Sequence, residues 1–306
     1  MQINLRRLRI DRWAVLLLLF AAVQIPAAAG KGANRPEPFG EPQVYKKVGS
    51  RELHVWVVKP ADWKAGDQHP AIVFFHGGGW TVSLLSQFNE QCKYFASRGM
   101  VCLQVEYRLV SSRQAPDVCI QDARSAMRWA RSHARELGID PQRIASAGGS
   151  AGGHLAAFVG MVDGCDDPSD DLKVSPKSNA MLLFNPVFDN GPQGPGNYGY
   201  DRIKDRYPQL SPAHNVSSDD PPAIVFFGAN DPVAGPAEGF REKMERAKVR
   251  CELKLYAGQG HGFFNHGRHF YETTVEADRF LASLGWLQGP PTLDRSAPVA
   301  RGKGDK

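Results

Sequence analysis

A serine, a histidine and an aspartate occur in this sequence in settings that suit nucleophilic catalysis. Ser150 stands at the centre of a Gly-x-Ser-x-Gly pattern between Gly148 and Gly152. A serine hydroxyl is a weak nucleophile at neutral pH, so it needs a histidine that takes its proton and a carboxylate that orients the histidine. Both types occur downstream in glycine-containing loops, as Asp231 and His261. We therefore predict that Ser150 is a nucleophile, His261 its general acid/base and Asp231 the orienting carboxylate.

The glycines around the serine predict a sharp turn between a strand and a helix. Such a turn strains the serine backbone, and a Cβ atom on either side would collide with the neighbouring strand or helix. The turn exposes the hydroxyl, and the following helix directs free N–H groups and the positive end of its dipole toward the reacting atoms. The five-residue pattern is a weak signal by itself, because glycine-rich turns are common.

Other histidines and aspartates fit the same roles less well. His261 follows a predicted strand and has glycine on both sides. Asp231 also follows a strand, whereas Asp219 and Asp220 precede that strand and would lie at the opposite edge of a parallel sheet. The other histidines considered as the base are His76, His154, His266 and His269. None of the four has the glycine-flanked loop setting, and the first is expected to be structural.

A second glycine cluster could supply the electrophilic half of the site. The stretch His-Gly-Gly-Gly-Trp at 76–80 directly follows the apolar run 71–75. Acyl transfer passes through a tetrahedral intermediate whose oxyanion needs backbone N–H donors, and the loss of one donor typically costs about 10²–10³ in rate. The N–H of Ala151, next to the serine, would complete the oxyanion hole.

Alternating strand and helix patterns predict the elements that hold these residues. The apolar run 71–75 contains no polar residue, as expected of a parallel strand covered on both faces, and the text of 70–75 recurs at 222–227. An antiparallel hairpin is predicted over 44–58, at one edge of the sheet. Repeated strand–helix units favour a mainly parallel sheet wrapped by helices. Further strands are predicted at 100–106, 143–147, 180–184 and 251–256, and helices at 120–137, 151–162, 234–247 and 270–284.

The chain ends differ in composition from the middle. Residues 1–29 resemble an export signal, with a basic start, an apolar run over 13–23 that is shorter than a membrane span, and small residues that predict cleavage near Ala29. An uncleaved N-terminal anchor is the alternative. We predict a linker over 30–43, one catalytic domain over 44–287 and a disordered tail over 288–306, rich in Pro, Gly and charge.

Charge and cysteine usage predict neither a nucleic-acid face nor a metal site. The net charge is +5, and much of the excess lies at the two ends. The five cysteines lack CxxC spacing, their odd number leaves at least one thiol free, and their pairing cannot be read from the sequence. The aspartates of the segment 163–176 fit no metal loop, so a solvated acidic loop is favoured over an ion site. No cofactor is predicted.

Taken together, these motifs resemble the α/β-hydrolase fold, and specifically hormone-sensitive-lipase-type and BD-FAE-like carboxylesterases. Besides the stretches above, Glu-Tyr-Arg-Leu at 106–109 and Asp-Pro-Gln-Arg-Ile at 140–144 match accessory motifs of that group, and the resemblance covers about 44–287. It implies an acyl-enzyme mechanism, with Gly78 and Gly79 joining Ala151 as oxyanion donors. Little sequence precedes the first strand, so the helical cap of the group is expected to be reduced or absent.

An open site would favour short acyl groups, on small alcohols or on a polysaccharide that carries acetyl or feruloyl esters. The segment 189–221, dense in Gly, Pro and Tyr, is either part of a substrate wall or an ordinary surface loop. The expected function is that of an exported carboxylic-ester hydrolase with no membrane span in the mature chain. The alternatives are a prolyl-oligopeptidase-like serine peptidase and a non-catalytic binding protein of the same fold. The sequence does not determine the oligomeric state.

Overall fold

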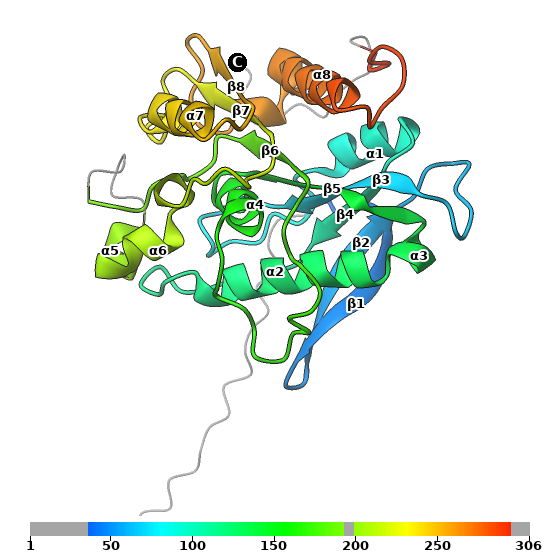
Figure 1. Ribbon diagram of the computed structural model, residues 1–306, viewed down its shortest axis with the longest axis horizontal. Coiled ribbons are helices and arrows are strands. Elements are labelled where there is room, and N and C mark those ends of the chain that lie inside the picture. Colours follow the sequence, from blue (N-terminus) through cyan, green and yellow to red (C-terminus); the bar gives the residue numbers. More distant parts are fainter. Residues whose placement is uncertain (1–35, 193–198, 295–306) are drawn as a thin grey trace, which may run out of the picture. The chain divides into compact units, whose positions relative to one another are not determined.

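The computed structural model describes residues 36–192 and 199–294, so the predicted export signal and its cleavage site lie outside the described residues. Within this part of the chain, eight strands form one sheet in the order β1-β2-β4-β3-β5-β6-β7-β8 (Figure 1). Strand β2 pairs antiparallel with β1 and β4, and the remaining neighbours are parallel. The strands are β1 Glu41–Val48, β2 Arg51–Val58, β3 His69–Phe75, β4 Val101–Val105, β5 Ile139–Gly149, β6 Ala180–Phe184, β7 Ala223–Gly228 and β8 Cys251–Tyr256.

Helices cover both faces of the sheet, which explains the unbroken apolar runs. Along β3, Val73 and Phe75 belong to a core shared with α2, α4 and α7, whereas Ile72 and Phe74 belong to a second core shared with α1 and α8 (Figure 1). Because successive side chains of a strand point to opposite faces, both sets are apolar only when both faces are covered. The longer helices are α1 Asn89–Ser97, α2 Asp117–Ser132, α4 Ala151–Met161, α7 Ala237–Arg246 and α8 Gly267–Ser283.

The structure confirms the predicted fold class and changes some element bounds. The helix expected over 120–137 begins at Asp117 and is divided into α2 and the short α3 Ala134–Leu137, which ends at Gly138 with φ of +66°. The insertion between β6 and β7 contains the four-residue helices α5 Tyr200–Ile203 and α6 Tyr207–Leu210. In the described residues, this short insertion takes the place of an extended helical cap.

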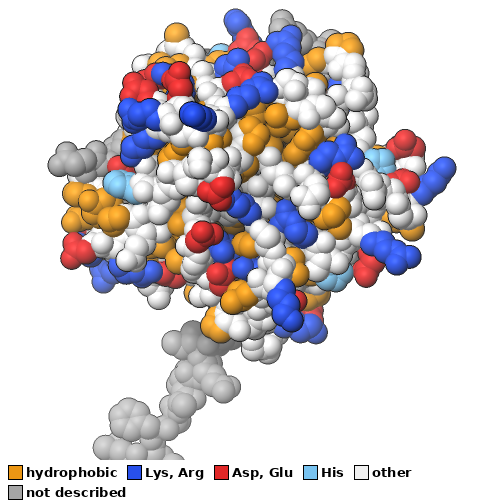
Figure 2. Space-filling model, viewed as in Figure 1, with side chains coloured by type: hydrophobic (Ala, Val, Ile, Leu, Met, Phe, Trp, Pro, Cys, Tyr) orange, Lys and Arg blue, Asp and Glu red, His pale blue; other side chains and the backbone are white. Residues whose placement is uncertain are grey.

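Three aspartates of the acidic segment after α4 are ion-paired, which contradicts the prediction of a solvated loop for these residues. Arg124 and Arg128 of α2 bind Asp166 at 2.7 and 2.5 Å, and Arg128 also binds Asp170 at 2.9 Å. The buried Lys46 of β1 lies 2.7 Å from Asp167 and is also paired with the buried carboxylate of Asp122. The prediction failed because the basic residues that face this loop come from α2 and β1, far away in the sequence. Figure 2 shows blue and red side chains interspersed on the face in view.

This network should make stability depend on acidic pH. Burial alone would raise the pKa of Asp167, but hydrogen bonds from Lys46 and Ser169 outweigh it and hold the pKa well below its usual range. A lowered folded-state pKa contributes stability that is present above the unfolded-state pKa, about 4, and is lost as the pH falls toward the folded-state pKa. We expect the melting temperature of the wild type to fall more steeply below about pH 4 than that of Asp167→Asn.

The control is Asp163→Asn, which alters an exposed carboxylate in the same loop. Its melting temperature should follow the wild-type pH dependence, measured by circular dichroism between pH 7 and pH 3. Parallel curves for the wild type and Asp167→Asn would show that this carboxylate does not contribute to acid lability.

The C-terminal segment is ordered further than predicted. Residues expected to begin a disordered tail pack against α1: Arg98 donates to the carbonyl of Gly289, and the N–H of Thr292 donates to the hydroxyl of Tyr94. Leu293 packs on the core shared by α1 and α8. Residues 295–306 lie outside the described part of the chain.

Of the helices in the described part, none combines the length and apolar character that a membrane crossing needs.

Candidate active site

Ser150 occupies the sharp turn that its glycine neighbours predict. Strand β5 ends at Gly149, helix α4 begins at Ala151, and the serine between them has φ of +55° and ψ of −118°. A positive φ is strained for any residue with a Cβ atom. The close packing also requires glycine, because a Cβ atom on Gly152 would lie 2.0 Å from the carbonyl oxygen of Phe75. The turn therefore fixes the hydroxyl at the carboxyl edge of the sheet.

Adding a methyl group at this turn should destabilise the protein. Gly152→Ala would place its Cβ against backbone oxygens of Phe75 and His76, which cannot move aside as a side chain can. We expect the free energy of unfolding to fall by about 3 kcal/mol, the upper end of the usual cost of overpacking. Urea denaturation followed by tryptophan fluorescence measures this change.

The matched control is Gly239→Ala, in helix α7, where a Cβ atom would have no neighbour within 4 Å. There the helix propensity of alanine should raise the free energy of unfolding by up to about 1 kcal/mol. A Gly152→Ala protein as stable as the wild type would show that the turn has room that the structure does not show.

The structure brings Ser150, His261 and Asp231 into one hydrogen-bonded chain. His261 Nε2 lies 2.8 Å from the Oγ of Ser150, and its Nδ1 lies 2.8 Å from Oδ2 of Asp231. The Asp231 side chain is fully buried, whereas 34% of the His261 side chain is exposed. The carboxylate accepts the Nδ1 proton, so Nε2 is left to accept the proton of the serine hydroxyl. This arrangement can activate the hydroxyl as a nucleophile.

Loops at the carboxyl ends of neighbouring strands hold the carboxylate and the imidazole. Asp231 follows β7, and its Oδ1 accepts the N–H of Val233 at 2.9 Å. His261 follows β8, and the adjacent Gly262 donates its N–H to the side chain of Asn185 at 3.0 Å. Asn185 is buried directly after β6 and has φ of +38°. The sequence motifs do not single out this residue, although a polar side chain at the carboxyl end of a central strand is a usable signal.

The glycine loop after β3 lies against the serine. A Cβ atom on Gly77 would lie 3.5 Å from the Cβ of Ser150, and Gly78 and Gly79 both have positive φ values. Gly77 donates its N–H to the side chain of Gln87, so this group is already used within the protein. The N–H of Ala151, in the first turn of α4, has no partner within that helix. The structure thus places Gly78 and Gly79 on the loop beside Ser150, and Ala151 directly after it.

The far side of the glycine loop is held by the insertion between β6 and β7. Arg202 of α5 donates from Nη1 to the carbonyl oxygen of Gly79 at 3.1 Å, and its guanidinium lies 5.8 Å from the centre of the Trp80 ring. Trp80 is buried and packs edge-on against His154, one turn beyond the serine. Part of the Gly- and Tyr-rich segment 189–221 therefore borders the site.

The histidines rejected as the base have other surroundings. Burial lowers the pKa of His76 and of His154 to about 4, so both are neutral at physiological pH. His154 Nε2 accepts no proton from the serine and instead lies 2.7 Å from the carbonyl of Leu210. His269 pairs with Glu272 of its own helix. These contacts are structural.

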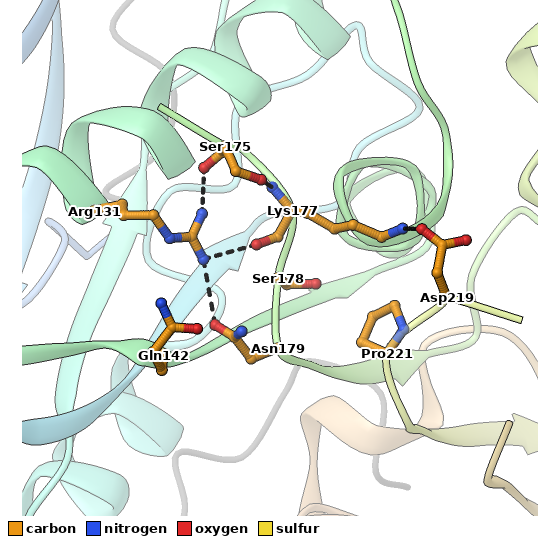
Figure 3. Close-up of a pocket in the computed structure, with 8 residues that line it drawn as sticks. All are labelled: Arg131, Gln142, Ser175, Lys177, Ser178, Asn179, Asp219 and Pro221. Atoms are coloured by element: carbon orange, nitrogen blue, oxygen red, sulfur yellow. Dashed lines mark hydrogen bonds and ion pairs between the residues drawn. The ribbon is translucent and has the colours of Figure 1, made fainter. Parts of the chain in front are cut away.

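A polar cavity of about 360 Å³ lies at the opposite edge of the sheet (Figure 3). Arg131 of α2 points across it and donates to the carbonyl oxygens of Ser175 and Lys177. Lys177 is paired with Asp219, whose pKa that contact lowers to about 2. Asp219 therefore lies at the edge of the sheet opposite to Ser150, His261 and Asp231, as its position before β7 predicts.

In the described residues, no group of three or more His, Cys, Asp or Glu side chains is placed to hold a metal ion, and all five cysteines are free thiols.

The chain is similar to known ester hydrolases. Residues 59–191 match the BD-FAE family, and residues 198–289 match the dienelactone hydrolase family. The carboxylesterase NlhH of Mycobacterium tuberculosis is 30% identical over 71% of this chain and 74% of that protein. An ethyl acetate hydrolase of Pseudomonas putida is 27% identical over 78% of this chain and 79% of its own length. The chain spans less than two thirds of other curated relatives, 58% of the carboxylic ester hydrolase LipN of Mycobacterium tuberculosis among them.

A solved esterase structure matches this chain over nearly the whole length of that esterase. The apo form of Thermogutta terrifontis esterase 2 is 43% identical, with a TM-score of 0.78, and the match covers 83% of this chain and 98% of that one. The same esterase has been solved with propionate bound, with butyrate bound, and phosphonylated by sarin. The family resemblance inferred from the motifs is confirmed. The serine in the sharp turn between β5 and α4, the mostly parallel sheet and the similarity to these relatives lead to one conclusion. The chain belongs to the carboxylesterase family of the α/β-hydrolase fold.

Proposed function

We propose that this protein is a serine carboxylic-ester hydrolase that acts through an acyl-enzyme. The observation that carries the proposal is the chain of hydrogen bonds from Asp231 through His261 to Ser150, at 2.8 Å each. An imidazole that is about one-third exposed and hydrogen-bonded to a buried carboxylate, beside a serine at a helix N-terminus, is suited to proton transfer coupled to acyl transfer.

The geometry supports a reaction in two halves. In the first, Ser150 Oγ attacks the ester carbonyl while its proton moves to His261 Nε2, and the negative charge formed on the carbonyl oxygen is stabilised by the N–H groups of Gly78, Gly79 and Ala151. The imidazolium then protonates the leaving alcohol as the C–O bond breaks. In the second half, water attacks the acyl-enzyme and gives its proton to the same nitrogen, and the imidazolium returns a proton to Ser150 Oγ as the acyl C–O bond breaks and the acid leaves. Asp231 stabilises the imidazolium in both halves.

We propose that the preferred substrates are short acyl esters, of small alcohols or of an acetylated or feruloylated polysaccharide. The insertion between β6 and β7 supports an open site, because its longest helices among the described residues, α5 and α6, have only four residues each. The propionate- and butyrate-bound forms of Thermogutta terrifontis esterase 2, and the name of the ethyl acetate hydrolase, point to small acyl groups in relatives.

A panel of p-nitrophenyl esters from acetate to laurate tests this proposal, together with acetylated xylan, a feruloyl ester and a prolyl peptide substrate. We expect kcat/KM to be highest for acyl chains of two to about four carbons, because a shallow site buries little of a longer chain. Highest turnover of laurate would contradict the open site. Turnover of the peptide and of no ester would favour the peptidase alternative, and turnover of nothing would favour the binding-protein alternative.

We also propose that the protein is exported and cleaved near Ala29. The support is the sequence of residues 1–29 alone, with its basic start, short apolar run and small residues before the cleavage site. N-terminal sequencing of the protein expressed with its native start decides this. A mature chain that begins at Gly30 is expected, and one that retains Met1 would show an uncleaved segment.

A further inference from the structure

Two amide side chains outside the triad connect the glycine loop to the loop that carries His261. The N–H of Gly77 donates to Oε1 of Gln87 at 2.7 Å, and Nε2 of Gln87 donates to Oδ1 of Asn265 at 3.1 Å. Nδ2 of Asn265 in turn donates to the carbonyl oxygen of Gly262 at 2.8 Å. We call Gln87 and Asn265 the amide bridge. It joins parts of the chain that are 178 residues apart.

The peptide groups next to His261 are held on both sides. Asn265 of the amide bridge donates to the carbonyl oxygen of Gly262. The N–H of Gly262 donates to the side chain of the buried Asn185 at 3.0 Å. Asn185 is itself anchored in the sheet, because its N–H donates to the carbonyl of Phe226 at 2.7 Å. The imidazole loop is thus tied to the sheet on one side and to the glycine loop on the other.

Apolar packing below the bridge fixes its place. The ring of the buried Phe264 lies so close to Gly149 that a Cβ atom there would be 2.6 Å from it, and the ring also packs on Phe88 and Phe184. Gln87 and Asn265 are both half-buried and directly adjoin Phe88 and Phe264 in the sequence. The same Cβ atom on Gly149 would lie 3.3 Å from Nε2 of Gln87, so this amide is next to the Phe264 ring. A hydrogen bond in such surroundings is stronger than one in water, and an unpaired amide there is costly.

The need for the bridge follows from the glycine loop itself. Gly77 has no side chain to restrict its backbone, so rotation about it would turn the next peptide, which carries the N–H of Gly78. The bond from the Gly77 N–H to Gln87 holds the peptide before Gly77, and His76 Nδ1, which lies 2.6 Å from the carbonyl oxygen of Gly77, holds the peptide after it. Gln87 therefore fixes the point from which the glycine loop starts. The sheet fixes where each loop begins, but the distance between the oxyanion donors and the imidazole depends on contacts between the loops.

We propose that Gln87 and Asn265 are positioning residues, which set the place of the oxyanion loop relative to His261 during ester hydrolysis. This inference rests on the proposed function. Because neither residue touches the reacting atoms, its removal should weaken stabilisation of the transition state and leave substrate binding nearly unchanged. The expected signature is a lower kcat with an unaltered KM.

A double-mutant cycle tests the bridge as a unit. We expect Gln87→Ala and Asn265→Ala each to lower kcat for p-nitrophenyl butyrate by about tenfold, the scale of one hydrogen bond, with KM changed by less than about twofold. The double variant should lose no more than about the larger single loss, because each substitution alone already breaks the bridge. Losses that multiply, to about a hundredfold, would overturn the coupling.

Two further variants separate positioning from simple loss of packing. Gln87→Met keeps the volume of the side chain without its hydrogen bonds, so it should reproduce the loss in kcat of Gln87→Ala with a higher melting temperature than Gln87→Ala, because the packing is retained. The control is Gln68→Ala, an exposed glutamine that directly precedes β3 at the opposite edge of the sheet, which should leave kcat unchanged. A Gln87→Met enzyme with wild-type kcat would refute the inference while the wild type still hydrolyses esters. Absence of wild-type turnover would instead refute the proposed function.

Discussion

Replacing Ser150 by alanine is expected to lower kcat for p-nitrophenyl butyrate by about 10⁵–10⁶-fold, as loss of the nucleophile does in other serine hydrolases. Without Oγ no acyl-enzyme can form, and His261 has no proton to accept from this position. The remaining rate would come from the oxyanion donors and from the imidazole acting on water. A burst assay with purified protein measures the effect, because the variant should also show no rapid release of one equivalent of p-nitrophenol.

Stability measurements exclude unfolding as the cause. Ser150→Ala retains the Cβ atom at φ of +55°, so its melting temperature should equal that of the wild type. Ser150→Gly should be equally inactive but more stable, because glycine adopts this conformation without the strain of about 1–3 kcal/mol that other residues carry. Equal turnover by Ser150→Ala and wild type would refute the assignment of the nucleophile.

Replacing Asp231 by asparagine is expected to lower kcat by about 10⁴-fold. The reason is the tautomer of His261. The oxygen of the new amide can still accept the N–H of Val233, so its nitrogen would face Nδ1 of the imidazole and donate to it. The ring proton would then reside on Nε2, which could no longer accept the proton of Ser150. Steady-state kinetics at pH 7 to 8 measure the loss, and KM should change little.

The matched control is Asp219→Asn, which alters a carboxylate at the opposite edge of the sheet. Asp219 is exposed and paired with Lys177, so its neutralisation should leave kcat within about twofold of the wild type. A loss as large as that of Asp231→Asn would mean that the carboxylate acts through general charge and not through the tautomer. Wild-type activity in Asp231→Asn would remove this residue from the site.

The size of each effect separates the roles of the residues. Loss of the nucleophile or of the orienting carboxylate should cost four or more powers of ten, whereas loss of the amide bridge should cost about one. The difference is physical. In the proposed mechanism, Ser150 and Asp231 determine whether the proton can move, whereas Gln87 and Asn265 would only restrict the relative positions of the two loops.

Much of the fold and all three triad positions could be predicted because their signals are local. A strand that is buried on both faces has to be apolar at every position, and β3 and β7 show this in nearly identical text. The elbow requires glycine at 148 and 152, because a Cβ at either would strike backbone. Parallel strands then place the loops that follow them at one edge, so the residues of those loops could be named without coordinates.

The prediction failed where the partner of a residue lies in another part of the chain. Arg124 and Arg128 have the period of a solvated helix face, and the aspartates of the following loop have the composition of a solvated segment. Only the fold shows that they bind each other. Pairing of this kind depends on how the loop after α4 folds back over α2. The sequence of neither segment alone shows that contact.

The sequence by itself determined which candidate residues follow which strands. A serine lies in a glycine-flanked turn after one strand, an aspartate follows a second strand, and a histidine follows a third. Steric and burial requirements act on residues that are neighbours in the chain, so they produce recognisable patterns in the amino-acid sequence. Only the tertiary structure decided how the loops are held, through Asn185, Gln87 and Asn265. An amide side chain suits almost any surface position, and its role arises from partners that folding brings to it from far along the chain.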